Sequence, residues 1–177
     1  GLQMQYDLNA IRAQFPALSV TDNDKERIYF DNPAGTQVSH FVVDKMNHCL
    51  LQANTNIHGY FRTSVMVDEL IAEARAAMAD LLNAPSPDEI IFGQNMTTLT
   101  LHLSISVGRT LRAGDEIVLS RMDHDANVSP WLLLAEDLDL NIRWLPFNIE
   151  TFEFDLDALD EVLTDRTRLV CVGAASN

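Results

Sequence analysis

The chain has 177 residues, of which 47% are hydrophobic, and its formal net charge is −14 at pH 7. This length can bury one substantial core, and the acidic balance argues against nucleic acid and anionic membranes as partners. The apolar runs are too short to span a bilayer, so no membrane association is expected. Two widely separated cysteines, Cys49 and Cys171, give no disulfide framework and favour a cytoplasmic location.

The first half of the chain predicts an N-terminal arm followed by two helices. Apolar residues at helical spacing indicate a short helix over residues 8–15. A polar loop is expected over residues 21–27, and three consecutive apolar or aromatic residues predict a short strand over 28–30. Longer helices are predicted over residues 38–53 and 70–82, because apolar side chains recur there three and four residues apart.

The second half alternates short apolar strands with helices. Strands are predicted over residues 89–92, 116–120, 142–146 and 168–173, and helices over residues 129–138 and 156–163. Buried strands separated by helices are typical of a parallel α/β sheet, because parallel neighbours need a crossover connection. The chain contains neither a GxxxxGK[ST] motif nor a glycine-rich dinucleotide fingerprint, which disfavours NAD.

One segment gives conflicting signals. Residues 98–107 alternate polar and apolar side chains with a period of two, which by itself predicts a strand. A parallel arrangement of the strands on either side of it instead requires a helical crossover. Local pattern and global topology therefore disagree over this segment.

In an open α/β sheet, ligands bind beyond the carboxyl ends of the strands. Three small, polar segments follow predicted strands here: residues 93–98, 121–127 and 174–177. By themselves they have ordinary explanations, a helix cap for the first and a solvated loop histidine for His124. No metal site is indicated, because the consecutive residues 123–125 project in different directions.

The ordered set of motifs resembles the class V aminotransferase family of pyridoxal-phosphate (PLP) enzymes, and within it the cysteine desulfurase and selenocysteine lyase branch. The likeness runs in order from residue 8 to residue 177. The matching stretches are YFDNPAG (29–35), NIH (56–58), DEIIF (88–92), NMTT (95–98), GDEIV (114–118), DHDANVSPW (123–131), RTRLV (166–170) and ASN (175–177).

This resemblance implies a role for four residues at the predicted strand ends. Met96 and Thr97 are implied to hold the cofactor phosphate through backbone N–H groups and the threonine hydroxyl. His124 is implied to stack on the pyridine ring as the catalytic residue, and Asn177 to hydrogen-bond the phenolic oxygen of that ring. The family also has a helix over residues 98–107, and a phosphate site needs a helix N-terminus, so we expect a helix there.

The resemblance further places Asn56 and His58 near the mouth of the substrate site, which in this family is often shared across a homodimer. The chain departs from the usual desulfurase pattern at several motif positions. Residues 95–98 read NMTT where Gly-Thr-Thr-Glu is usual, Asp125 replaces a second histidine, and Gly59 replaces an arginine. These departures indicate a divergent subgroup and leave the amino acid substrate open.

The fold class implied is α/β, a PLP-dependent transferase of type I: part of the mixed or parallel sheet of the large domain, with flanking helices and an N-terminal helical arm. We expect an arm over residues 1–27, an active-site-mouth segment with a helix over 28–65, and the first part of the PLP-binding domain over 66–177. The only lysines are Lys25 and Lys45, and neither follows a predicted strand end, so the Schiff-base lysine is expected outside this chain.

The sequence therefore predicts the N-terminal part of a cytoplasmic, PLP-dependent lyase or transferase that removes sulfur or selenium from an amino acid, and that is inactive without the rest of the enzyme. A homodimer is expected. The alternative is a catalytically inactive module of the same fold, serving oligomerisation or binding a partner that covers the open sheet edge.

Overall fold

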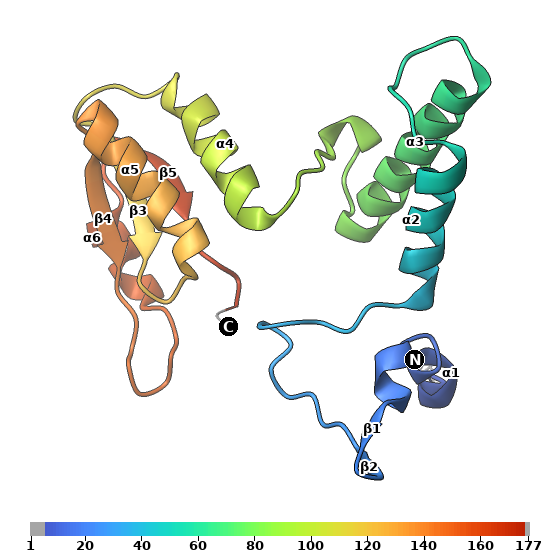
Figure 1. The fold of residues 1–177 in the computed structure, drawn as a ribbon. Helices are drawn as coiled ribbons and strands as arrows, with labels where there is room; N and C mark the ends of the chain where they lie inside the picture. The colour runs from blue at the N-terminus through green and yellow to red at the C-terminus, as the bar shows by residue number, and fades with distance from the viewer. Residues whose placement is uncertain (1–5, 176–177) are drawn as a thin grey trace. The chain divides into compact units, whose positions relative to one another are not determined.

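The computed structural model describes residues 6–175, and the chain divides into two compact units, residues 1–91 and residues 92–177 (Figure 1). The first unit is mainly helical. Its elements are α1 (Leu8–Arg12), η1 (Pro16–Ser19), β1 (Thr21–Asp22), β2 (Lys25–Glu26), α2 (His40–Gln52), α3 (Arg62–Leu82) and η2 (Pro87–Glu89).

The two long helices of this unit confirm the helical periodicity of the sequence. α2 begins after Ser39, whose hydroxyl accepts a hydrogen bond from the Phe41 N–H at 3.3 Å. α3 ends at Asn83, which adopts the left-handed conformation (φ 53°) that commonly closes a helix.

A small antiparallel hairpin, β1 with β2, occupies the segment that the sequence predicted as a polar loop. Its two central residues, Asn23 and Asp24, have φ of 52° and 63°. Positive φ at both central positions is what a type I′ hairpin turn requires, and Asn and Asp tolerate it better than most residues.

Two predicted strands are wrong. Residues 28–30 and 89–92 have no strand assignment, and Phe30 is 95% exposed. Neither segment has a strand beside it among the described residues, and an extended apolar segment becomes a strand only when its backbone groups find partners. η2 instead occupies the start of the second segment, with the Ser86 hydroxyl accepting from the Asp88 N–H at 3.1 Å.

The second unit is built on a three-stranded parallel sheet with the order β4-β3-β5, which confirms the predicted α/β class. Its helices lie against both faces of the sheet (Figure 1). The elements are α4 (Met96–Gly108), β3 (Glu116–Ser120), η3 (Asp125–Asn127), α5 (Ser129–Leu138), β4 (Asn141–Leu145), η4 (Leu156–Ala158), α6 (Leu159–Val162) and β5 (Thr167–Cys171).

The central strand β3 is buried along its whole length and supplies the core on both faces of the sheet. On one face, Ile117 and Leu119 pack with Trp131 and Leu134 of α5. On the other face, Val118 packs with a smaller cluster that includes Val162 of α6. Successive side chains of a strand point to opposite faces, so one continuous apolar run serves both clusters.

The conflicting segment is helical, as the topology required. α4 buries a narrow row of small residues, Thr100, Ser104 and Gly108, which lie four residues apart. Gly108 approaches α5 so closely that a Cβ built on it would lie 2.5 Å from Leu134 Cδ1. Because the period-two alternation surrounds this row with apolar side chains, the sequence shows no single apolar face of the kind that predicts a helix.

Candidate functional site

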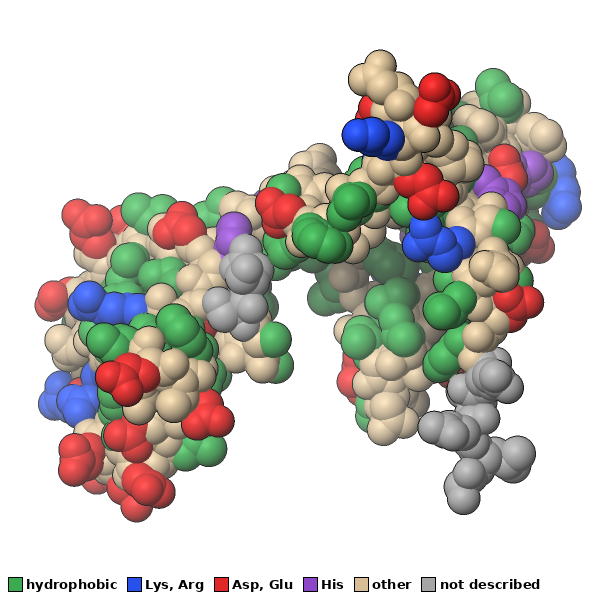
Figure 2. Space-filling view, turned by 90° about the horizontal axis from the view of Figure 1, so that it is seen from below, with side chains coloured by type: hydrophobic (Ala, Val, Ile, Leu, Met, Phe, Trp, Pro, Cys, Tyr) green, Lys and Arg blue, Asp and Glu red, His purple; other side chains and the backbone are tan. Residues whose placement is uncertain are grey.

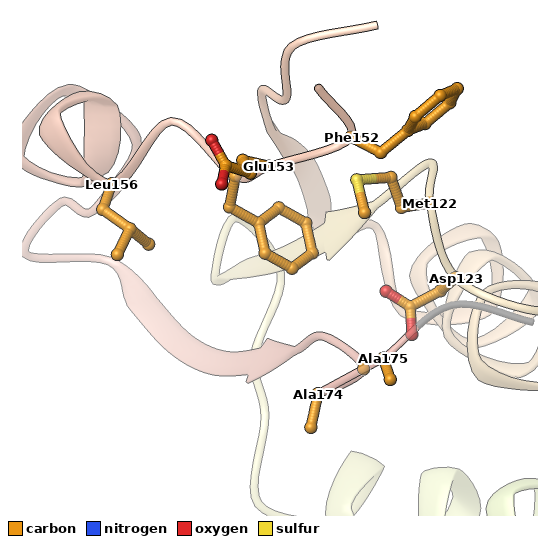
Figure 3. Close-up of a pocket in the computed structure, with 9 residues that line it drawn as sticks. Met122, Asp123, Phe152, Glu153, Leu156, Ala174 and Ala175 are labelled. Carbon is orange, nitrogen blue, oxygen red and sulfur yellow. The ribbon is translucent and has the colours of Figure 1, made fainter. Parts of the chain in front are cut away.

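The carboxyl ends of the strands carry a pocket of about 570 Å³ in the second unit. The turn after β3 contributes Met122 and Asp123, and the segment after β5 contributes residues 173–175. Figure 3 shows the Asp123 carboxylate directed toward the Ala174–Ala175 segment, with Met122 beside Phe152. The pocket therefore lies where ligands bind in open α/β sheets. Of the three segments that the sequence singled out, those after β3 and β5 contribute to it, whereas residues 93–98 do not line it and follow no strand among the described residues.

The sequence did not single out the third wall of this pocket. It comes from the loop between β4 and η4, which contributes Phe152, Glu153 and Phe154. Phe154 forms an isolated antiparallel bridge with Phe147, which turns the loop back toward the sheet. The alternation of aromatic and acidic residues over 152–155 was the available signal.

His124 is exposed and lies in the turn directly after these pocket residues. Its Nδ1 accepts a hydrogen bond from the Ala126 N–H at 3.1 Å, so the side chain caps η3. Asp125 beside it accepts from the Ser129 hydroxyl at 2.6 Å, at the start of α5. The turn that carries His124 is thus tied to its own backbone and to the helix that follows.

Met96 and Thr97 are the first two residues of α4, and both are exposed. The N-cap is Asn95, whose Oδ1 accepts from the Thr98 N–H at 2.9 Å. The first N–H groups of a helix have no carbonyl partner within the helix, and the helix dipole makes this end favourable for an anion. The N-terminal turn of α4 can therefore hold a phosphate group.

The packing of α4 brings its first turn toward the same edge of the sheet. The C-terminal residue Gly108 lies against Leu134 and Leu138, toward the end of α5, while α4 also contacts η3, which precedes α5. The two helices therefore run in the same general direction, as they do in Figure 1. Both start near the carboxyl ends of the strands, so the structure brings Met96 and Thr97 to the edge that carries His124.

Asn177, the remaining predicted cofactor residue, lies outside the described residues. Asn56 and His58 belong to the first unit, where α3 fixes their backbone. The buried Ser64 hydroxyl donates to the Asn56 carbonyl at 2.7 Å. The Asp68 carboxylate accepts from the His58 N–H at 3.0 Å, and one of its oxygens lies 3.4 Å from the His58 Nδ1.

The pocket and the start of α4 differ in the charge that they favour. Asp123 and Glu153 both line the pocket, and acidic side chains are spread over the surface of this unit (Figure 2). An anion is disfavoured beside these carboxylates, so a phosphate fits the first turn of α4 better than the pocket itself. Burial and the nearby Asp123 charge raise the pKa of the Cys171 thiol to about 12, which keeps it neutral and unreactive.

None of the helices in the described part of the chain combines the length and apolarity that a membrane span needs. The two lysines, Lys25 in β2 and Lys45 in α2, both belong to the first unit. The Lys45 ammonium lies 3.6 Å from the Glu73 carboxylate of α3.

Comparison with known proteins assigns this architecture to a family. The family model described as "Aminotransferase class-V" matches residues 28–177. The chain is 35% identical over 176 residues to a cysteine desulfurase of Yersinia pestis (strain Pestoides F), covering 98% of this chain and 43% of that protein. The chain therefore belongs to the class V aminotransferase family, as its motifs predicted, and it spans 43% of the length of this curated relative.

Solved structures agree with this assignment. An apo cysteine desulfurase from Thermococcus onnurineus NA1 superposes with a TM-score of 0.83 at 26% identity, over 98% of this chain and 41% of that one. A C-DES mutant with glycine covalently linked to its PLP cofactor superposes with a TM-score of 0.71 at 26% identity, over 91% of this chain and 40% of that one. The chain is thus similar to the front part of PLP-dependent cysteine desulfurases.

Proposed function

We propose that the chain supplies the phosphate-holding and ring-stacking segments of a PLP-dependent enzyme that removes sulfur or selenium from an amino acid. The family and the desulfurase relatives support this class of reaction. The observation that supports the proposal is that α4, whose first turn contains Thr97, packs against η3, the element that follows His124. Cysteine and selenocysteine are both candidate substrates.

In this proposal each residue has a separate role. The Met96 and Thr97 N–H groups and the Thr97 hydroxyl bind the phosphate, for which a helix N-terminus provides about 0.3–1 kcal/mol, or ~2 kcal/mol when partly buried. The exposed His124 ring stacks on the pyridine, a contact of about 0.5–1.5 kcal/mol beyond burial. Asn177 hydrogen-bonds the phenolic oxygen. When bound, PLP supplies an electron sink for bond cleavage in the amino acid.

Binding of PLP against unphosphorylated pyridoxal tests the phosphate site. The quenching of tryptophan fluorescence in this chain reports both ligands, because Trp131 and Trp144 lie in the second unit. We expect PLP to bind about two- to fivefold more tightly, the ratio that a helix N-terminus supplies. Thr97→Val reduces this ratio, whereas Thr110→Val, the same change just beyond the other end of α4, leaves it unchanged. Equal affinity for the two ligands contradicts the proposal.

We further propose that the chain by itself forms no covalent bond to PLP and is inactive. Its two lysines lie in the hairpin and in α2, and Lys45 pairs with an acidic neighbour on α3. Borohydride treatment in the presence of PLP followed by mass spectrometry is the direct measurement. A specific mass increase at one lysine, at PLP concentrations that leave other proteins unmodified, contradicts this part of the proposal.

A second candidate function is a partner-binding module without catalysis. It is supported by β5, which lies at an edge of the sheet and whose Val170 side chain is 45% exposed. An open edge presents unpaired N–H and C=O groups that favour pairing with another chain. Light scattering after size exclusion tests this candidate, because a compact, folded monomer at all concentrations contradicts a module that folds only as an oligomer or with a partner.

We also propose a homodimer in the cytoplasm, with Asn56 and His58 near the mouth of the substrate site. The free thiols of Cys49 and Cys171 support a reducing compartment. The hydrogen bonds between the 56–58 segment and α3 support an ordered conformation of this segment, as a substrate site requires. Substitution of Asn56 in the whole enzyme is expected to raise KM for the amino acid without loss of bound cofactor.

A further inference from the structure

The turn that carries His124 is anchored to the core by a chain of side-chain hydrogen bonds. Trp131 is 2% exposed and belongs to the main core cluster of the second unit. Its indole Nε1–H donates to Asn127 Oδ1 at 3.4 Å. The other end of the same amide, Asn127 Nδ2, donates to Asp123 Oδ1 at 2.9 Å.

This chain fixes the orientation of the Asn127 amide. An indole can only donate and a carboxylate can only accept, so the amide oxygen must face Trp131 and the amide nitrogen must face Asp123. Reversing the amide would lose both hydrogen bonds. Asn127 therefore couples a rigid core side chain to Asp123, the residue directly before His124.

The carboxylate at the far end of the chain is also held in place. A Cβ built on Gly173 would lie 2.7 Å from Asp123 Oδ1, so the carboxylate rests on the backbone that follows β5. Asp123 Oδ2 is buried and has no hydrogen-bond partner among residues 6–175. Within the described part of the chain, the Asn127 amide is thus the side chain that donates to this carboxylate, and its loss would leave a buried acceptor unsatisfied.

His124 lies within the span that Asp123 and Asn127 fix. Its Nδ1 accepts from the N–H of Ala126, a buried residue inside the same span. A ring nitrogen that accepts a hydrogen bond carries no proton, so the neutral ring bears its hydrogen on Nε2. The exposed edge of the ring consequently presents an N–H donor.

We propose that Asn127 is a positioning residue for His124. It holds the turn in the geometry that places the Ala126 N–H on Nδ1, and so fixes the ring in a single orientation and in the Nε2–H tautomer. The functional meaning rests on the proposed function: a ring held in advance loses little conformational freedom when it stacks on a flat cofactor. A group that approaches its free edge must then be a hydrogen-bond acceptor.

Long-range ¹H–¹⁵N NMR of the chain labelled with ¹⁵N-histidine tests the proposal without any cofactor. At an alkaline pH where imidazole is neutral, we expect the His124 signals to show the Nε2–H pattern, with the two ring nitrogens widely separated in chemical shift. His124→Gln identifies these signals by their disappearance. An Nδ1–H pattern, or averaged shifts that indicate exchange between tautomers, overturns the proposal.

Variants then separate positioning from general stability. Asn127→Ala is expected to bring the two His124 nitrogen shifts together. Trp131→Phe removes the N–H donor and keeps a smaller aromatic side chain in the core, so it serves if Asn127→Ala does not fold. The control Asn141→Ala removes an exposed amide whose Nδ2 donates to the Gly114 carbonyl at 3.4 Å.

Asn141 begins β4, at the edge of the sheet opposite the His124 turn, so its variant is expected to leave the His124 signals unchanged. Equal tautomer patterns in the Asn127 variant and in the wild-type chain refute the positioning role. The PLP comparison is a separate readout, since equal binding of PLP and pyridoxal refutes the proposed function and leaves the tautomer result standing.

Discussion

The hydroxyl of Ser64 is expected to control the order of the segment that carries Asn56 and His58. Ser64 is 0% exposed and makes two hydrogen bonds with this segment. Its Oγ donates to the Asn56 carbonyl at 2.7 Å and accepts from the Gly59 N–H at 2.7 Å. Ser64→Ala removes both bonds and adds no bulk.

The size of the effect follows from these two bonds. Each contributes about 1 kcal/mol net, so their loss costs about 2 kcal/mol of local stability. The Asn56 carbonyl lies on an exposed residue and can be resolvated, which keeps the cost from rising toward the larger penalty of a buried unsatisfied group. A change of about 2 kcal/mol corresponds to an opening equilibrium about 30-fold more favourable, since 1.4 kcal/mol is tenfold.

Amide hydrogen exchange measures this opening directly at the Gly59 N–H, which donates a hydrogen bond to the Ser64 hydroxyl in the wild-type chain. Ser106→Ala is the matched control, because Ser106 is an exposed helical serine whose hydroxyl donates only to the His102 carbonyl of its own helix. We expect about 30-fold faster exchange at Gly59 in Ser64→Ala and no change in the control. Unchanged exchange at Gly59 in Ser64→Ala would refute the reasoning.

Two further predictions concern stability. Because burial and Asp123 raise the pKa of Cys171 from 9.0 to about 12, the unfolded thiol loses its proton before the folded one does. Its contribution to stability is therefore fully present below about pH 9 and is lost as pH rises toward 12. Urea unfolding across this range should show that the free energy of unfolding falls less steeply with pH in Cys171→Ala than in the wild-type chain. Equal slopes of the unfolding free energy against pH would contradict this prediction. Gly114→Ala should lower the free energy of unfolding by about 1–2 kcal/mol, because its φ is +82° and a Cβ would lie 2.8 Å from the Arg166 guanidinium. Gly35→Ala, with no atom near its Cβ, is the neutral comparison, and a similar loss in both variants would exclude backbone strain as the cause.

Sequence patterns predicted the parts of the fold where one residue run decides the structure. Residues 116–120 form β3 as predicted, because a continuous apolar run suits a strand that is buried on both faces. Residues 129–138 form α5 as predicted, with Pro130 in its first turn. The segment 28–30 has a similar apolar composition and forms no strand, because the described residues offer its backbone no partner.

For the candidate site too, the sequence predicted some features and only the structure revealed others. Local sequence placed His124 in the segment after a strand end, whereas motif order identified the family and implied the roles of Met96 and Thr97. The anchoring of His124 through Asn127 and Trp131 was not predicted, because spacing along the chain does not reveal which amide hydrogen meets which acceptor.

Residue order by itself determined the family, the parallel α/β class and the extent of the strongly apolar or strongly periodic elements. Tertiary structure decided that residues 96–108 are a helix, since the close approach of Gly108 to α5 is a contact between distant segments. It also decided the pocket walls and the orientation of the His124 ring. The physical reason is that periodicity records only which side of an element is apolar, whereas packing and hydrogen bonding depend on what that side meets.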